Sequence, residues 1–153
     1  MLILACGNRD RADDAAGLLV AERLRELSID AEECAGEAPD LMEAWSAADD
    51  VIVVDCVMTG VPAGTVHLWD ASHPLTFKSS GSTHGFGLGE AIELARSLRR
   101  LPARLRIYGI EGKNFEIGGT VSTEVKRGVA EVVNKIAADV GPDSKSATRY
   151  PHS

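Results

Sequence analysis

Short apolar runs alternate with segments of helical periodicity along most of this 153-residue chain. Leu2–Cys6, Val51–Val54 and Leu105–Ile110 predict strands that are buried on both faces. Thr65–Trp69 alternates as a strand at the edge of a sheet does, and Ile29–Cys34 is a weaker strand candidate. Between these runs, apolar residues at helical spacing predict four helices, within 13–27, 39–45, 88–98 and 121–136.

This alternation of strands and helices predicts an α/β protein with a mostly parallel, twisted sheet of about five strands. Helices should cover both faces of the sheet and give a three-layer α/β/α sandwich. We expect residues 1–140 to form one domain and residues 141–153, which have no periodicity, to be a flexible tail. Such a sheet places its functional residues in loops beyond the carboxyl ends of its strands.

The composition excludes several classes of function. A net charge of −7 disfavours binding to nucleic acid or to anionic lipid. No apolar run approaches the roughly 20 residues of a membrane span. The three cysteines lack metal-ligand spacing and are odd in number, so we expect free thiols, no disulfide and no thiolate catalysis. Together with the absence of a signal-peptide pattern, these features predict a cytoplasmic protein.

Four polar residues fall where the predicted strands end or where a helix begins. Asp14 follows the first strand, Asp55 ends the Val51–Val54 run, Glu111 follows the late strand, and His84 precedes a helix. Parallel neighbouring strands would bring Asp14 and Asp55 to one rim, where His84 could join them. Two carboxylates and an imidazole are ordinary ligands for zinc or nickel.

Each of these residues also has a purely structural interpretation. Asp14 could stabilise a helix start, Asp55 could be a structural strand-end residue, and the backbone could satisfy His84. Other chemistries have less support. The Gly7-Asn8 turn could cradle a phosphate, but the chain has no GxGxxG or Walker motif. It also lacks the GxSxG elbow of serine hydrolases and the HExxH helix of zinc proteases.

The same residues occur in four ordered blocks that resemble the hydrogenase maturation endopeptidases. The first is a strand, a Gly-Asn turn and an acid pair: LILACGNRDRADDAAG. The second is a strand ending in aspartate, then a loop: VIVVDCVMTGVPAGT. The third and fourth are a histidine before a helix, STHGFGLGEAIELA, and a strand with a Gly-Ile-Glu turn, RIYGIEGKNFEIGGTVSTEV. The blocks span most of residues 2–138.

The resemblance implies an endopeptidase that removes a C-terminal extension from the large-subunit precursor of a nickel–iron hydrogenase after nickel insertion. It implies that Asp14, Asp55 and His84 are both the metal-binding and the catalytic residues. The nickel would be supplied by the substrate, and another divalent metal such as zinc could occupy the same site. Whether the metal takes part in cleavage or only in recognition is left open.

The chain departs from the family pattern at three places. Ala15 replaces a frequent glycine, the loop Cys34–Glu37 replaces a frequent Asp-Gly-Gly-Thr, and Gly112 follows the Gly-Ile-Glu turn in place of proline. The changed Cys34–Glu37 loop leaves a second hypothesis open, which is a non-catalytic, nickel-dependent binding or chaperone module. A flavodoxin-like nucleotide binder is a third hypothesis, which the acid pair disfavours.

Overall fold

The strands form one five-stranded sheet in the computed structural model, which describes residues 1–74 and 87–149, with residues 142–149 described by backbone alone. The described elements, in chain order, are β1 (Leu2–Cys6), η1 (Ala12–Ala15), α1 (Ala16–Glu26), β2 (Glu32–Cys34), α2 (Ala38–Ala44), β3 (Asp50–Val57), β4 (Val66–Asp70), α3 (Leu88–Ser97), β5 (Arg104–Glu111) and α4 (Thr123–Arg149). Their order follows the predicted alternation of strands and helices.

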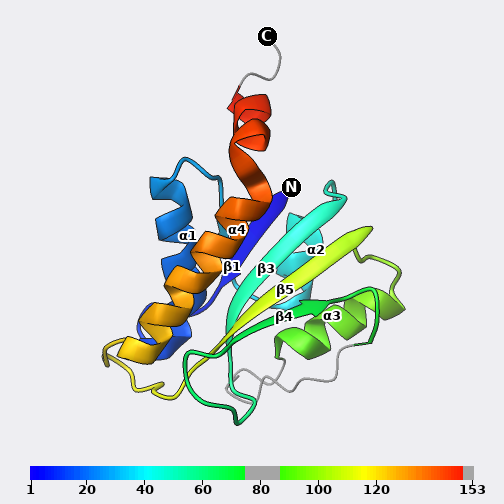
Figure 1. The fold of residues 1–153 in the computed structure, drawn as a ribbon. Coiled ribbons are helices and arrows are strands. Elements are labelled where there is room, and N and C mark those ends of the chain that lie inside the picture. The colour runs from blue at the N-terminus through cyan, green and yellow to red at the C-terminus, as the bar shows by residue number, and fades with distance from the viewer. Residues whose placement is uncertain (75–86, 150–153) are drawn as a thin grey trace.

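The sheet has the strand order β2-β1-β3-β5-β4. The first four of these strands are parallel, and β4 pairs antiparallel with β5 at the edge. Figure 1 shows α1 and α4 on one face and α2 and α3 on the other. The predicted three-layer α/β/α fold is therefore confirmed, and the alternating segment 65–69 is an edge strand as expected.

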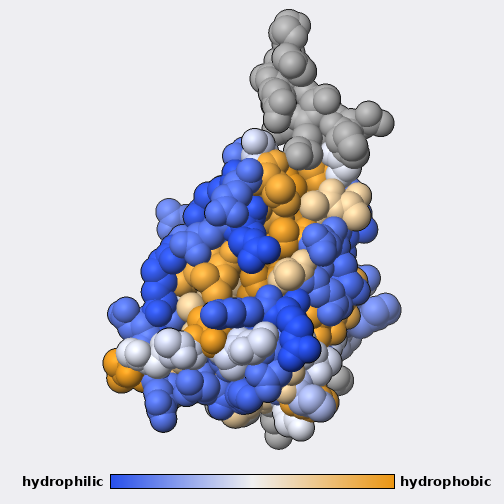
Figure 2. Space-filling model, turned by 60° about the vertical axis from the view of Figure 1, so that its left-hand side comes forward, coloured by the Kyte–Doolittle hydropathy of each residue, from blue (hydrophilic) through white to orange (hydrophobic). Residues whose placement is uncertain are grey.

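The apolar face of each helix packs on the sheet. Leu24 of α1 and Ile136 of α4 are fully buried in the core cluster on one face, and Ile92 of α3 is fully buried in the cluster on the other. Figure 2 brings the α1 side of the molecule forward and shows hydrophobic surface lying between hydrophilic borders. No helix among the described residues is long and apolar enough to cross a membrane.

Gly17 lets α1 approach the sheet closely. A β-carbon at this position would lie 2.4 Å from the carbonyl oxygen of Cys6 and 2.7 Å from that of Val54. Both neighbours are backbone atoms of the sheet, so they cannot move aside as a flexible side chain can. Glycine is therefore required where α1 crosses β1 and β3.

Two element boundaries differ from the sequence prediction. Asp55 does not end its strand, because the ladder between β3 and β5 continues through the pair Val57–Glu111. The last helix is longer than predicted and reaches Arg149, with a non-helical Gly141 at φ 69°. The proposed tail 141–153 lies partly outside the described residues, as does most of the predicted loop 72–81.

Candidate functional site

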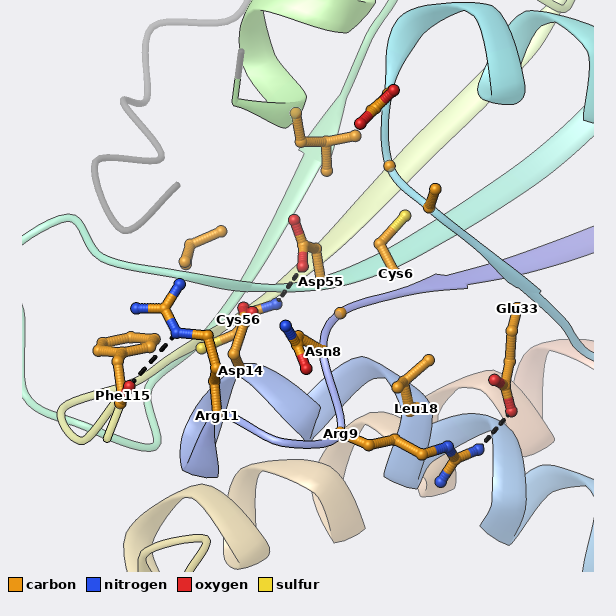
Figure 3. Close-up of a pocket in the computed structure, with 16 residues that line it drawn as sticks. Cys6, Asn8, Arg9, Arg11, Asp14, Leu18, Glu33, Asp55, Cys56 and Phe115 are labelled. Carbon is orange, nitrogen blue, oxygen red and sulfur yellow. Dashed lines mark hydrogen bonds and ion pairs between the residues drawn. The ribbon is translucent and has the colours of Figure 1, made fainter. Parts of the chain in front are cut away.

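A cleft of about 450 Å³ lies beyond the carboxyl ends of β1 and β3. The chain passes from β1 to β2 on one side and reaches β3 on the other, so these two strands flank the point where the strand order reverses. Open α/β sheets bind their ligands in such a crevice. Asp14 and Asp55 both line the cleft, and Figure 3 shows them with their neighbours. The predicted convergence of these two carboxylates is therefore present.

The turn after β1 positions Asp14. Gly7 has φ +150°, and a β-carbon there would lie 2.3 Å from the carbonyl oxygen of Asp14. The next residue, Asn8, donates its backbone N–H to the same carbonyl at 3.1 Å. The Gly-Asn turn thus packs directly on the backbone of η1 and holds Asp14 at the rim of the cleft.

Asp55 is a partly buried carboxylate on β3 with a strongly altered acidity. Burial, and after it the negative charge of Asp14, raise its pKa to about 7. The backbone N–H of Cys56 donates to Asp55 Oδ1 at 2.8 Å and opposes the rise. Two carboxylates that disfavour each other's charge in a cleft are a suitable place for a cation, which would relieve the repulsion.

His84, the third predicted ligand, lies outside the described residues. Within residues 1–74 and 87–141, no group of three histidine, cysteine, aspartate or glutamate side chains could hold a metal ion. The carboxylates of Asp14 and Asp55 fit a divalent metal in their chemistry, and a metal held there would need a third protein ligand from elsewhere. The assignment of His84 stays a prediction.

Asp13, the neighbour of Asp14, has a structural role that the sequence reasoning missed. Its side chain is fully buried and accepts hydrogen bonds from the backbone N–H groups of Lys113 (2.9 Å), Asn114 (2.9 Å) and Ser122 (2.7 Å). The hydroxyl of Ser122 donates to the same carboxylate at 3.0 Å. Asp13 thereby joins η1 to the segment between β5 and α4.

Glu111 was a candidate for the rim because it follows the late strand, but its carboxylate serves the loop after β3. It is 1% exposed and accepts hydrogen bonds from the backbone N–H groups of Thr59 (2.7 Å) and Gly60 (3.1 Å). The Thr59 hydroxyl donates at 2.8 Å, and His67 Nε2 lies 3.1 Å from Glu111 Oε1. Glu111 therefore fixes the loop and β4, and it does not line the cleft.

Two arginines that the sequence reasoning did not single out also line the cleft (Figure 3). Arg11 Nε donates to the carbonyl oxygen of Phe115 at 3.4 Å, and Arg9 forms ion pairs with Glu22 and Glu33. Their position between the Gly-Asn turn and η1 is the signal that could have identified them. They place two guanidinium groups in the lining beside the two carboxylates.

The Cys34–Glu37 loop forms another part of the cleft lining. Ala35, Gly36 and Glu37 line the cleft, and Gly36 has φ +85°. The departure from the family pattern at this loop thus lies where a ligand would enter. The three cysteines are free.

An open α/β sheet with a carboxylate-lined cleft at its switch point is typical of α/β proteins that bind a ligand in that cleft. Within that class, residues 33–139 match the family model of HycI, hydrogenase maturation protease. The chain belongs to the hydrogenase maturation protease family, and its fold is that of these peptidases. The family that the sequence resemblance predicted is therefore confirmed.

Solved structures agree with this assignment. The hydrogenase maturating endopeptidase HybD from E. coli matches at a TM-score of 0.75 and 19% identity, over 91% of this chain and 90% of that one. The HycI protease from Thermococcus kodakarensis KOD1 matches at 0.66 and 25%, over 90% and 89%. The HybD protease from Thermococcus kodakarensis matches at 0.64 and 24%, over 91% and 97%. No curated protein matches in sequence.

Proposed function

We propose that this chain is an endopeptidase that removes the C-terminal extension of a nickel–iron hydrogenase large-subunit precursor after nickel insertion. The family assignment supports the class of reaction, and the names of the similar structures support the kind of partner. Asp14, Asp55 and His84 would recognise the nickel that the precursor carries. We place this step in the cytoplasm, because three free cysteines suit a reducing compartment.

The electrostatics of Asp14 and Asp55 are the observation that carries this proposal. The pKa of Asp55 is raised to about 7 by burial and by Asp14, so the metal-free cleft disfavours two ionised carboxylates. A divalent ion carried by a substrate would reverse this preference and favour both charges. The pair therefore distinguishes a nickel-loaded precursor from an empty one by charge alone.

The two carboxylates would act by holding and orienting the loaded precursor. The Gly-Asn turn fixes the backbone of Asp14, and the sheet fixes the backbone of Asp55, so both carboxylates start from backbone positions that are held in place. A divalent ion at this position can polarise a carbonyl group or lower the pKa of a water molecule. The cleft volume of about 450 Å³ is within the range of sites that bind small ligands or a few residues of a peptide.

The decisive experiment mixes the protein with a nickel-loaded large-subunit precursor and follows loss of the C-terminal peptide by mass spectrometry. We expect cleavage of the loaded precursor and none of the nickel-free precursor. Asp14→Asn and Asp55→Asn should abolish cleavage. Asp30→Asn, an exposed carboxylate that does not line this cleft, is the matched control and should cleave normally.

The same mixture tests the second hypothesis, a non-catalytic binding or chaperone module. Stable binding of the loaded precursor without any peptide release would overturn the endopeptidase assignment in favour of that module. Equal cleavage of loaded and nickel-free precursor would instead leave the peptidase in place and remove metal recognition from Asp14 and Asp55.

A further inference from the structure

Two of the three cysteines are direct neighbours on adjacent strands of the sheet. Cys6 ends β1 and Cys34 ends β2, and the two residues are partners in the parallel ladder. Both belong to the core cluster on the α2 and α3 face, so their side chains lie on the same side of the sheet. Neighbouring strands lie about 4.8 Å apart, which is within the range of Cα separations that a disulfide spans.

The pair lies beside the cleft, with one sulfur more accessible than the other. Cys6 is 2% exposed and lines the cleft, whereas Cys34 is only partly buried, directly before the cleft-lining loop 35–37. A β-carbon at position 36 would lie 3.6 Å from Cys6 Sγ, but residue 36 is a glycine and places no side chain over the sulfur. Cys34 does not itself line the cleft, but it is the more accessible of the two thiols, and Cys6 is buried beside it.

The two thiols also differ in acidity. The hydrogen bond from Cys6 lowers the pKa of Cys34 to about 6, and the backbone N–H groups of Gly36 and Ala35 act in the same direction. The same hydrogen bond, together with burial, raises the pKa of Cys6 well above its usual value. Near neutral pH, Cys34 is thus mainly a thiolate, the nucleophilic form, and Cys6 is a thiol that donates to it.

We propose that Cys34 and Cys6 form an oxidisable dithiol at the cleft, with Cys34 as the residue that reacts with a hydroperoxide and Cys6 as the resolving thiol. The Cys34 thiolate attacks one peroxide oxygen, the O–O bond breaks, and an alcohol or water leaves after taking up a proton. Cys34 is then a sulfenic acid. The Cys6 sulfur attacks it, the S–O bond breaks, and the departing hydroxide takes the Cys6 proton as water.

The product is a Cys6–Cys34 disulfide, in which both sulfurs are oxidised and one peroxide is reduced. Cys56 is not the partner of this reaction, because it belongs to the core cluster on the opposite face of the sheet. A soft-metal site is not the better interpretation, since no third histidine, cysteine or carboxylate completes a metal group among the described residues. The disulfide would tie the start of the 35–37 loop to β1 and so fix part of the cleft lining.

The test treats the reduced, full-length protein with hydrogen peroxide in the absence of precursor, so its outcome does not depend on the proposed peptidase activity. We expect the count of free thiols to fall from three to one without unfolding, as monitored by circular dichroism. Digestion with trypsin and a glutamate-specific protease separates Cys34 from Cys56, because Glu37 and Glu43 lie between them. The linked peptides should contain Cys6 and Cys34.

Single variants assign the two roles. Cys6→Ala, which also removes the hydrogen bond that lowers the pKa of Cys34, should react more slowly than the unmodified protein and stop at a Cys34 sulfenic acid, which a cyclic diketone probe traps. Cys34→Ser should leave Cys6 unmodified by the same dose of peroxide. Cys56→Ser is the matched control and should form the disulfide as the unmodified protein does. If Cys6→Ala fails to fold, Cys34→Ser and the peptide map still decide. Oxidation that links Cys56, that modifies all three thiols equally, or that appears only after unfolding would overturn the proposal.

Discussion

Asp13 and Asp14 are adjacent in the chain, yet their carboxylates serve different parts of the molecule. Asp13 is completely buried and binds the backbone of residues 113, 114 and 122, whereas Asp14 faces the cleft. The turn of η1, which begins with Ala12 at φ 48°, separates the two directions. Asp13 therefore stabilises the backbone around the site, and Asp14 lines the cleft.

Asp13→Asn should lower the free energy of unfolding by about 2–4 kcal/mol, because an amide nitrogen would face backbone donors in a buried position. Urea denaturation measures the change. Asp30→Asn, an exposed carboxylate, is the control and should change stability by less than about 0.5 kcal/mol. If Asp13→Asn matched that control, the buried hydrogen bonds would have no net stabilising value.

Asp55→Asn should abolish nickel-dependent cleavage while the protein stays folded. Asparagine nearly preserves the volume of aspartate and can still accept the hydrogen bond from the Cys56 N–H, but it carries no charge for a divalent ion. The measurement pairs thermal unfolding with precursor cleavage at a temperature where both proteins are folded. A folded and fully active variant would remove Asp55 from the site.

The stability of the metal-free protein should depend on pH through Asp55. Its pKa is about 7 in the folded state and near 3.8 when unfolded, so between these values the folded state binds more protons. The contribution of Asp55 to stability therefore falls as pH rises from about 4 to about 7 and is constant above that range.

Relative to Asp55→Asn, the unmodified protein should lose at most about 4 kcal/mol over this range, since each pKa unit corresponds to about 1.4 kcal/mol. Chemical denaturation of both proteins with a chelator present, at several pH values, isolates the effect of this one group. A constant difference between the two proteins from pH 4 to pH 8 would contradict the raised pKa. Addition of a divalent ion at pH 8 should reduce the difference.

Glu111→Gln should loosen the loop after β3 and cost about 1–3 kcal/mol, since its amide nitrogen would meet the backbone donors of Thr59 and Gly60. Hydrogen exchange should become faster at those two amides. Glu26→Gln, which changes an exposed side chain of α1, is the matched control. Unchanged exchange at Thr59 and Gly60 would show that other contacts hold the loop.

Gly17→Ala should destabilise the fold by about 1–3 kcal/mol, because the added carbon would meet the carbonyl oxygens of Cys6 and Val54. Relief of that contact requires α1 to move away from the sheet. Since η1 leads directly into α1, the displacement should also disturb Asp14 and reduce precursor cleavage more than the loss of stability explains. A stable variant with full activity would contradict this prediction, because it would mean that α1 can shift without a loss of folding free energy.

Local periodicity was sufficient to predict the fold. The apolar runs at 2–6 and 51–54 identify buried parallel strands, and the alternating 65–69 identifies the edge. The end of β3 was misplaced, because β-branched composition stops at Val54 whereas the hydrogen-bonded ladder with β5 extends to Val57. The type of side chain predicts the start of this strand better than its end, because the end depends on pairing with the neighbouring strand.

The site was only partly predictable. Chain order and parallel pairing were enough to bring Asp14 and Asp55 together. The roles of Asp13 and Glu111 could not be predicted, because their hydrogen-bonding partners are backbone groups that tertiary folding brings near. Every residue has such groups, so the sequence does not show which ones will be the partners. The pairing of Cys6 with Cys34 similarly depends on strand register, which a weak, three-residue β2 does not reveal.

The hydrogen bonds of Asp13 have a consequence for the timing of synthesis. Ser122 follows Asp13 by 109 residues. The turn that carries Asp13 and Asp14 therefore leaves the ribosome long before the donors that bind Asp13. Closing a loop of that length has an entropic cost, which later contacts must offset. A nascent chain that ends before Lys113 would carry Asp14 on a turn that lacks this support. The turn that carries Asp14 would thus gain these hydrogen bonds only late in translation.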